Sequence, residues 1–250
     1  MTFKAYFKKE FMEAKRENRL IILFAGFFIL ALMSPVISKI MPSIIQDKYG
    51  EVVAEAMKMS ASECVANYLN KDFGQVCILV LCLVLGGILC DEITKKYIVL
   101  PITKGGKKDS IVFSKFIFYS ITMFIITVSS MFCVIYYTFT IFEEDMPKFV
   151  SIMYSSINVY IYVLLIIAVI FFWSSIFTKS IGAALMSMTV NMVLMFCNTF
   201  EFEFNPYLLV VDASNLVEKV PIKPAVTSVV SIIVLVLISM YIFKNKEIES

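Results

Sequence analysis

Long apolar runs separated by short polar segments are the dominant pattern of this chain. A helix needs about 20 mostly apolar residues to cross a bilayer. Six stretches approach or exceed that length, at about 20–41, 73–90, 114–140, 150–177, 181–200 and 225–243. Only residues 178–180 separate the fourth and fifth runs, which predicts a tight helical hairpin there. The pattern predicts an all-α polytopic membrane protein with six transmembrane helices, in which residues 1–250 form a single domain.

Lys and Arg residues are unevenly divided between the two sides of this predicted topology. With six spans both termini lie on one side, and that side carries fifteen Lys and Arg residues against seven on the other. Short loops rich in Lys and Arg stay in the cytoplasm. The charge distribution therefore predicts that both termini are cytoplasmic, and the protein is expected to be a multi-pass protein of the cell membrane.

Two segments on the predicted outer side are long enough to carry structure of their own. The stretch 43–72 contains helix formers over 51–59, which predicts a short surface helix. The stretch 201–224 mixes aromatic residues and leucines with scattered charges. It is a candidate for a segment that dips back into the outer leaflet, where irregular backbone must be covered by protein.

The first 19 residues predict an amphipathic helix that leads directly into the first span. Its aromatic residues and its basic residues lie on opposite faces of a helical wheel (Phe3, Tyr6, Phe7, Phe11 and Ala14 against Lys4, Lys8, Lys9, Lys15 and Arg16). This pattern is typical of a helix lying in the membrane interface, with its aromatic face toward lipid. Glu10, Glu13 and Glu17 form a separate stripe, and carboxylates are poor lipid contacts, so a contact with protein is one interpretation. A solvated helix with ordinary i,i+4 ion pairs is the alternative.

The amino-acid composition argues against most kinds of catalytic or metal site. Apolar residues make up 60% of the chain, the net charge is +2, and there is no histidine. The lack of histidine excludes His-assisted nucleophiles and the commonest metal ligand. The six cysteines lie mostly in or beside apolar runs without a CxxC pair, which favours apolar packing over a metal site or disulfides. No catalytic, cofactor-binding or metal-binding residue is predicted, and the small net charge gives no indication of nucleic-acid binding.

The loop after the second span has the most recognisable polar features. It begins with Asp91 and Glu92 and reaches Pro101, which predicts a short cytoplasmic helix over 92–101. A soluble partner could bind a helix with charged ends and an apolar middle. The alternative is an ordinary positively charged cytoplasmic loop. The Gly-Gly-Lys-Lys run at 105–108 does not fit a phosphate loop, which needs Gly, four residues and then Gly-Lys-Ser/Thr.

Polar residues and methionines at membrane depth are candidates for lining a transport pathway. They are Asn158, Asn191, Asn198, Met188, Met192 and Met195. Intramembrane Asn usually bonds a neighbouring helix, so ordinary helix packing is the competing interpretation. No Asp, Glu, Lys or Arg lies deep in a predicted span, which argues against a carrier driven by protons or sodium.

Three features together resemble the permease subunits of the type-2 exporter class of ABC transporters. The first is the basic amphipathic lead-in from Lys8 to Arg19, and the second is the six-span topology with both termini inside. The third is the first cytoplasmic loop, with its acidic start, short helix, Leu100-Pro101, basic residues and Ser114-Lys115-Phe116 at the next span. Lys95-Lys96 stand about where the family has Gly-Thr, so the loop departs from the family pattern there.

This resemblance implies a division of labour between chains. Two permease subunits, identical or different, would enclose a pathway, and each would dock a separate ABC ATPase subunit that binds ATP and Mg. Docking is implied for Asp91, Glu92, Lys95, Lys96, Tyr97, Leu100, Pro101, Glu10, Glu13 and Glu17. This chain would then hold no cofactor and would not be an enzyme. The expected cargo is an apolar or amphipathic peptide, drug or lipid.

Other classes of membrane protein are the alternatives. One is a non-transporting membrane partner, such as a sensor or an immunity protein that sequesters a peptide. A stand-alone secondary carrier usually needs repeat symmetry or a buried ionisable residue. An intramembrane enzyme would need His or paired carboxylates at membrane depth, which the sequence lacks. Copurification with an ATPase separates the permease from all three.

Overall fold

The structure, a computed structural model, describes residues 3–49, 59–103, 105–106, 108–200 and 202–246. Within these residues the chain is helical and contains no strand. In the described part of the chain, six helical segments are long and apolar enough to cross a membrane, namely Arg19–Gln46, Ala61–Thr94, Lys108–Phe142, Phe149–Ile176, Ser180–Phe200 and Ile222–Asn245. The predicted all-α polytopic fold is confirmed, and the chain is a multi-pass membrane protein.

The spans are built from long helices and from one composite segment. The long helices are α2 (Arg19–Tyr49), α8 (Lys108–Phe142), α9 (Phe149–Ile176), α10 (Ser180–Cys197) and α12 (Ile222–Asn245), and the short 3-10 helix η2 (Asn198–Phe200) continues α10. The second span consists of α4 (Ala61–Asn67), the π-helix η1 (Tyr68–Cys77) and α5 (Ile78–Leu85). The remaining helices are α1 (Phe3–Arg16), α6 (Cys90–Thr94), α7 (Val99–Thr103) and α11 (Leu208–Ser214).

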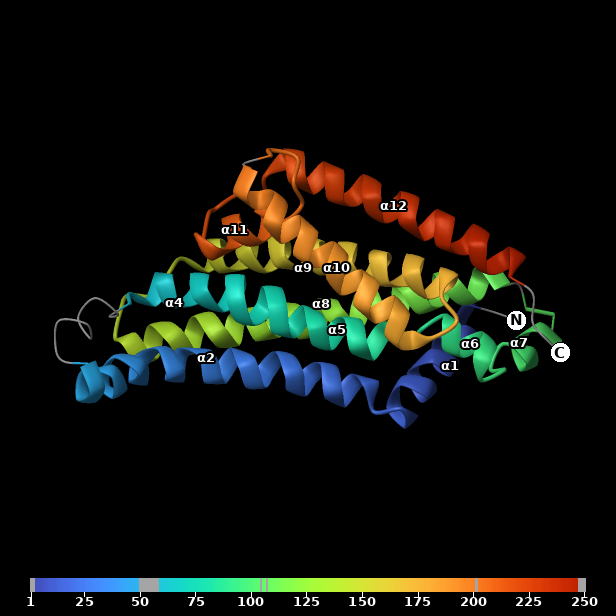
Figure 1. Cartoon of the computed structure of the whole chain (residues 1–250), viewed down its shortest axis with the longest axis horizontal. Coiled ribbons are helices and arrows are strands. Elements are labelled where there is room, and N and C mark those ends of the chain that lie inside the picture. The colour runs from blue at the N-terminus through green and yellow to red at the C-terminus, as the bar shows by residue number, and fades with distance from the viewer. Residues whose placement is uncertain (1–2, 50–58, 104, 107, 201, 247–250) are drawn as a thin grey trace.

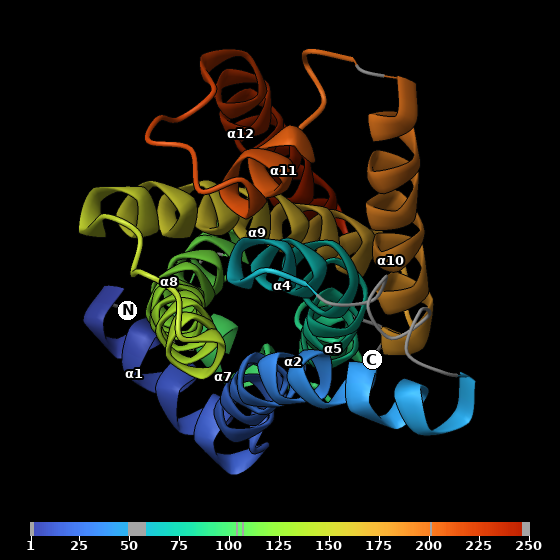
Figure 2. The ribbon, with the colours of Figure 1, turned by 90° about the vertical axis from the view of Figure 1, so that its left-hand side faces the viewer.

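Helix α9 forms the centre of the bundle. It packs against α5, α8, α10, α11 and α12, and Figure 2 shows it crossing the middle of the molecule. Its sequence is apolar on all sides, as is typical of a buried helix, and side chains from Val159 to Phe171 are mostly buried. Helices α1, α6 and α7 lie at one end of the bundle, and α4 and α11 lie near the other (Figure 1). We call these the α6 end and the α11 end.

The second span starts earlier than the predicted residue 73. Polar residues such as Asn67, Lys71 and Asp72 lower the hydropathy of the segment before Phe73. The helix nevertheless begins at Ala61, where Ser60 and Glu63 form a reciprocal capping box. Packing then outweighs the polar residues, because the segment from Ala61 to Leu69 buries most of its apolar side chains. The π-helical turns of η1 follow directly.

The predicted single helix over 92–101 is wrong, because the structure divides this segment into α6 and α7. Lys96 breaks the helix by adopting a φ of 55°, in the left-handed region. Helix α7 restarts at Val99 with Pro101 in its first turn. Proline is tolerated there because first-turn amides have no partner within the helix. Pro101 therefore lies inside a helix that it was expected to end.

Helix α11, the central part of the segment that is a candidate for dipping back into the bilayer, packs onto the bundle. Helix α11 contacts α9, η1 and α4 and buries Leu209, Val210 and Ala213. Asn205 stabilises the turn before it by donating to the Leu194 carbonyl at 2.9 Å and accepting from the Tyr207 amide at 3.1 Å. The backbone here is thus covered by protein. The helix predicted over 51–59 lies outside the described residues, apart from Met59.

Candidate functional site: buried charges at the α6 end

Helix α1 packs against the bundle with a face that combines apolar and acidic residues. Tyr6, Glu10 and Ala14 are buried, spaced four residues apart on one face of the helix. Phe7 meets the Phe118 ring of α8 edge-on, with ring centroids 5.3 Å apart. The prediction that Tyr6 and Ala14 face lipid is therefore wrong, whereas Phe11 is 51% exposed. Asn18 makes the bend between α1 and α2 with a φ of 55°, which Asn tolerates better than most residues.

Lys115 of α8 lies at the centre of a buried ion cluster that joins three helices. Its Nζ atom lies 2.5 Å from Glu10 Oε2, 3.2 Å from Glu13 Oε1 and 2.9 Å from Glu92 Oε1. Lys9 completes the cluster, with its Nζ atom 2.6 Å from Glu92 Oε1. We call these five residues the Lys115 cluster. It connects α1, α6 and the start of α8 through side chains that are far apart in sequence.

Burial makes the arrangement of charge in this cluster energetically important. Lys115 is fully buried, and Glu10 and Glu92 are at most 1% exposed. Three carboxylates face two ammonium groups, so the cluster carries an excess negative charge when all five residues are ionised. Burial raises the pKa of Glu10 above its ordinary value, although Lys115 and Lys9 act in the opposite direction. Protonation of Glu10 would remove the excess charge.

The same three carboxylates have the spacing of a metal site, but an ammonium group already fills it. One oxygen each from Glu10, Glu13 and Glu92 lies within 4.8 Å of the others. Oxygen ligands of this kind suit hard cations. Lys115 Nζ is within hydrogen-bonding distance of all three residues, so the lysine is itself the cation of the site. A metal ion would have to displace it.

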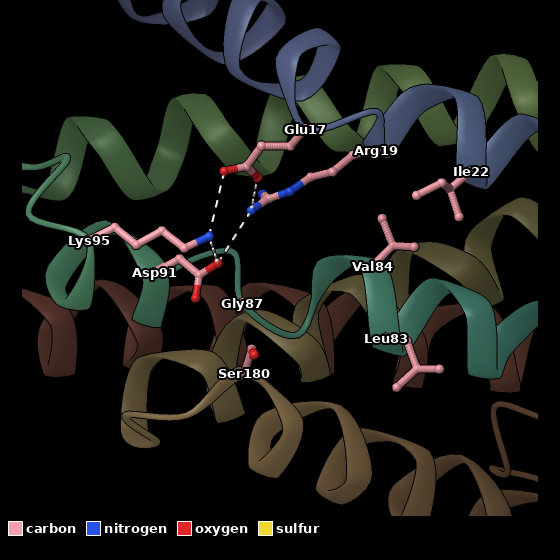
Figure 3. A pocket seen from close by; sticks show the side chains of 9 residues that line it. All are labelled: Glu17, Arg19, Ile22, Leu83, Val84, Gly87, Asp91, Lys95 and Ser180. Carbon is pink, nitrogen blue, oxygen red and sulfur yellow. Dashed lines mark hydrogen bonds and ion pairs between the residues drawn. The ribbon is translucent and has the colours of Figure 1, made fainter.

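A second group of charges lies beside the Lys115 cluster, around the start of α2. Arg19 lies 2.5 Å from Glu17 and donates to the Tyr119 hydroxyl of α8 at 3.4 Å. On α6, Lys95 lies 2.8 Å from Asp91. The hydrogen bond from Lys95 to Asp91 raises the pKa of that lysine. These two pairs flank an open cleft of about 530 Å³ between α2, α5, α6 and α10 (Figure 3).

The predicted docking residues therefore fall into two sets. Glu10, Glu13 and Glu92 are held inside the chain, so their carboxylates are not presented on its surface. Glu17, Asp91, Lys95, Lys96 and Tyr97 are at least partly accessible, and Arg16 donates to the Tyr97 hydroxyl at 3.2 Å. Leu100 and Pro101 lie in α7, with side chains outside the described set. Glu10 and Glu13 do contact protein, as one interpretation of the sequence proposed. Their contacts are within this chain and not with a partner subunit.

The polar candidates for a pathway lie mainly inside the subunit. Asn191 of α10 accepts from the Tyr162 hydroxyl at 2.6 Å and donates to the Gly74 carbonyl of η1 at 2.8 Å. Asn158 is buried and donates to the Lys219 carbonyl at 3.3 Å. The bonds of Asn191 join helical segments, as the competing interpretation expects, and the bond of Asn158 joins α9 to the loop between α11 and α12. The Asn198 side-chain oxygen is buried without a partner. Met188 and Met195 pack against the core, and Met192 is 39% exposed on α10.

Sequence reasoning missed the residues that hold the α6 end together. It counted Lys115 and Arg19 among the positive charges of the inner side, but both are buried ion-pair partners. One signal was present, since Lys115 is followed by a long apolar run and stands next to Phe116. A lysine at that position must find carboxylates if it is to be buried. The spacing of Glu10 and Glu13 on one face of α1 offers them.

The sequence matches no family model and no curated protein.

Proposed function

We propose that this chain is the membrane-spanning permease subunit of an ATP-driven exporter of the cell membrane. It pairs with a second permease subunit, identical or different, and docks a separate ABC ATPase that binds ATP and Mg. Its cargo is an apolar or amphipathic peptide, drug or lipid. The α6 end is the cytoplasmic end, in agreement with the distribution of Lys and Arg.

The observation that carries this proposal is the exposed corner between α6 and α7. Thr94, Lys96 and Val99 are exposed there, at and beyond the end of the second span. The corner is also firmly held, because Glu92 in the preceding turn is bound by Lys115 of α8 and Lys9 of α1. The Ile98 amide donates to the Glu92 carbonyl at 3.1 Å, which ties α7 to the same anchor. A partner that pushes on this corner moves α1 and α8 with it.

The contacts of Glu92 inside the chain decide which substitutions can test docking. A Glu92→Lys substitution places a second ammonium beside Lys115 and disrupts the anchor itself, so loss of docking in that variant has two explanations. Val99→Glu alters an exposed apolar side chain and leaves the Lys115 cluster intact. Thr178→Glu introduces the same charge at an exposed residue of the α9–α10 connection, which lies at the same end. It serves as the matched control.

The experiment is purification of the tagged full-length chain from its native membranes in mild detergent, with identification of copurifying proteins. The expected result is a nucleotide-binding ATPase in near-stoichiometric amount with the wild type and with Thr178→Glu. It should be strongly reduced with Val99→Glu. A well-folded wild-type chain that carries no nucleotide-binding protein would overturn the proposal. Equal recovery with both variants would overturn docking at the corner.

A further inference from the structure

The cleft at the α6 end has two charged sides that meet only loosely. On one side Glu17 and Arg19 are 2.5 Å apart, and on the other Asp91 and Lys95 are 2.8 Å apart. Across the cleft, the distances from Arg19 to Asp91 and from Lys95 to Glu17 are both 3.7 Å. Figure 3 shows the four side chains converging, two from the turn before α2 and its first residue and two from α6 and its C-cap. Each side thus has one cation and one anion. The ion-pair distances across the cleft are longer than those within each side.

The cleft lies at the level where lipid headgroups are expected. Arg19 begins the first span, Asp91 lies three residues before the end of the second, and Ser180 begins the fifth. Gly86 lets the end of α5 and the start of α10 approach closely, because a Cβ there would lie 2.7 Å from the Ser180 carbonyl oxygen. Helix α10 begins at Ser180 without a side-chain cap. Ser180 lines the cleft, so the partly positive N-terminal end of α10 lies beside it.

An apolar strip runs from the cleft toward the middle of the membrane. Leu83 lines the cleft, and Leu79 and Val76 follow at helical spacing on the same outer face of the second span. These three side chains are 54%, 41% and 43% exposed. Helices α2 and α10 both contact α5, and Figure 2 shows them on either side of it. The strip is therefore the floor of a track bounded by two helices.

We propose that this cleft is a binding site for a phospholipid whose headgroup carries both a phosphate and a primary amine. The phosphate lies near Arg19, Lys95 and the start of α10, and the ammonium group donates to Glu17 and Asp91. An acyl chain follows Leu83, Leu79 and Val76. The two cations and two anions balance, so a zwitterionic headgroup complements the cleft better than an anionic one. A primary ammonium also offers hydrogen bonds that a quaternary amine lacks. The site does not depend on the exporter proposal.

Native mass spectrometry of the delipidated full-length protein tests this site directly. We expect phosphatidylethanolamine to bind at least tenfold more tightly than phosphatidylglycerol or phosphatidylcholine with the same acyl chains. Lys95→Gln, which removes one cation, and Leu83→Trp, which fills the track, should each weaken phosphatidylethanolamine binding about tenfold, or ~1.4 kcal/mol. Lys95 and Leu83 are both exposed, so neither change threatens folding. Asp91→Asn combined with Glu17→Gln should abolish the preference over phosphatidylglycerol.

Matched controls place the same substitutions far from the cleft. Lys223→Gln alters an exposed lysine that pairs with Glu203 near the α11 end, and Leu237→Trp enlarges an exposed leucine of α12. Both should leave phosphatidylethanolamine binding unchanged. Equal binding of the three lipids, or an unchanged affinity in Leu83→Trp, would overturn the proposal. Soluble glycerophosphoethanolamine should compete poorly, and competition equal to that of the lipid would mean that the site recognises a free headgroup instead.

Discussion

Replacing Lys115 by methionine is the substitution that should damage the α6 end most severely. Methionine keeps the length of the side chain but removes the ammonium group that lies within 3.2 Å of three carboxylates. Lys9 then remains as the cation bound to the three glutamates, and it is 26% exposed. Removing one partner of a buried ion pair costs about 3–5 kcal/mol, because the remaining charge is left uncompensated. We expect a loss of this size.

The structure also predicts where that loss will appear. Helix α1 is held to the bundle mainly by its packing on α8, so its release costs less than unfolding of the spans. Amide hydrogen exchange in Lys115→Met should therefore increase throughout α1 and α6 and change little in α9. Lys179→Met, an exposed lysine in the α9–α10 connection, is the matched control and should shift stability by less than about 0.5 kcal/mol.

A rescue variant separates charge from packing. Lys115→Met combined with Glu10→Met and Glu13→Met leaves Glu92 to pair with Lys9, and it replaces the other buried charges by apolar side chains. Replacing a buried ion group by well-packed hydrophobic residues of similar volume is often neutral for stability. The triple variant should therefore recover most of the protection in α1. If Lys115→Met exchanges like Lys179→Met, the reasoning that this cluster anchors α1 is refuted.

Three further predictions concern the surroundings of this cluster and the bundle core. Burial raises the pKa of Glu10 above 4.5, among the charges of Lys9, Glu13, Glu92 and Lys115, so the folded state binds a proton that the unfolded chain releases. Stability should fall as the pH rises from about 4.5 through the raised pKa, and the same thermal titration of Glu10→Gln should lack this contribution; parallel curves would contradict the assignment. Asn191→Leu should cost about 1–2 kcal/mol by leaving the Tyr162 hydroxyl and the Gly74 carbonyl unpaired, and a double-mutant cycle with Tyr162→Phe should show coupling, whereas additive losses would argue against the bond. Lys96→Val should destabilise the α6–α7 corner by about 1 kcal/mol, because a β-branched residue fits a φ of 55° poorly, while Lys96→Gly should not; equal thermal unfolding of the two variants would exclude strain at this position.

The hydrophobic pattern was sufficient for the class of fold because membrane spans are specified by length and apolarity alone. It failed where packing decides between alternatives. The helix before Phe73 contains polar residues that lower local hydropathy, yet burial of Tyr68 and Leu69 stabilises it. The break at Lys96 has no signal in the sequence, since lysine does not favour a positive φ.

In the candidate site, too, the sequence indicated the local pattern but not the packing partner. The acidic stripe of α1 is visible on a helical wheel. It also indicates that these residues contact protein. The partner was not visible, because Lys115 is about a hundred residues away and resembles the other lysines of a positively charged loop. Pairing between such distant residues depends on how α1 packs against α8, which helical periodicity does not specify. The lipid cleft likewise depends on the close approach at Gly86, which appears only in three dimensions.

ATP hydrolysis by the purified preparation tests the central claim most directly. The wild-type chain and Thr178→Glu, purified in mild detergent from native membranes, should carry ATPase activity at equal levels per mole of chain. Val99→Glu should lose most of that activity while its helical content and hydrogen exchange in α1 remain those of the wild type. Folded wild-type protein without associated ATP hydrolysis would contradict the assignment as a permease subunit.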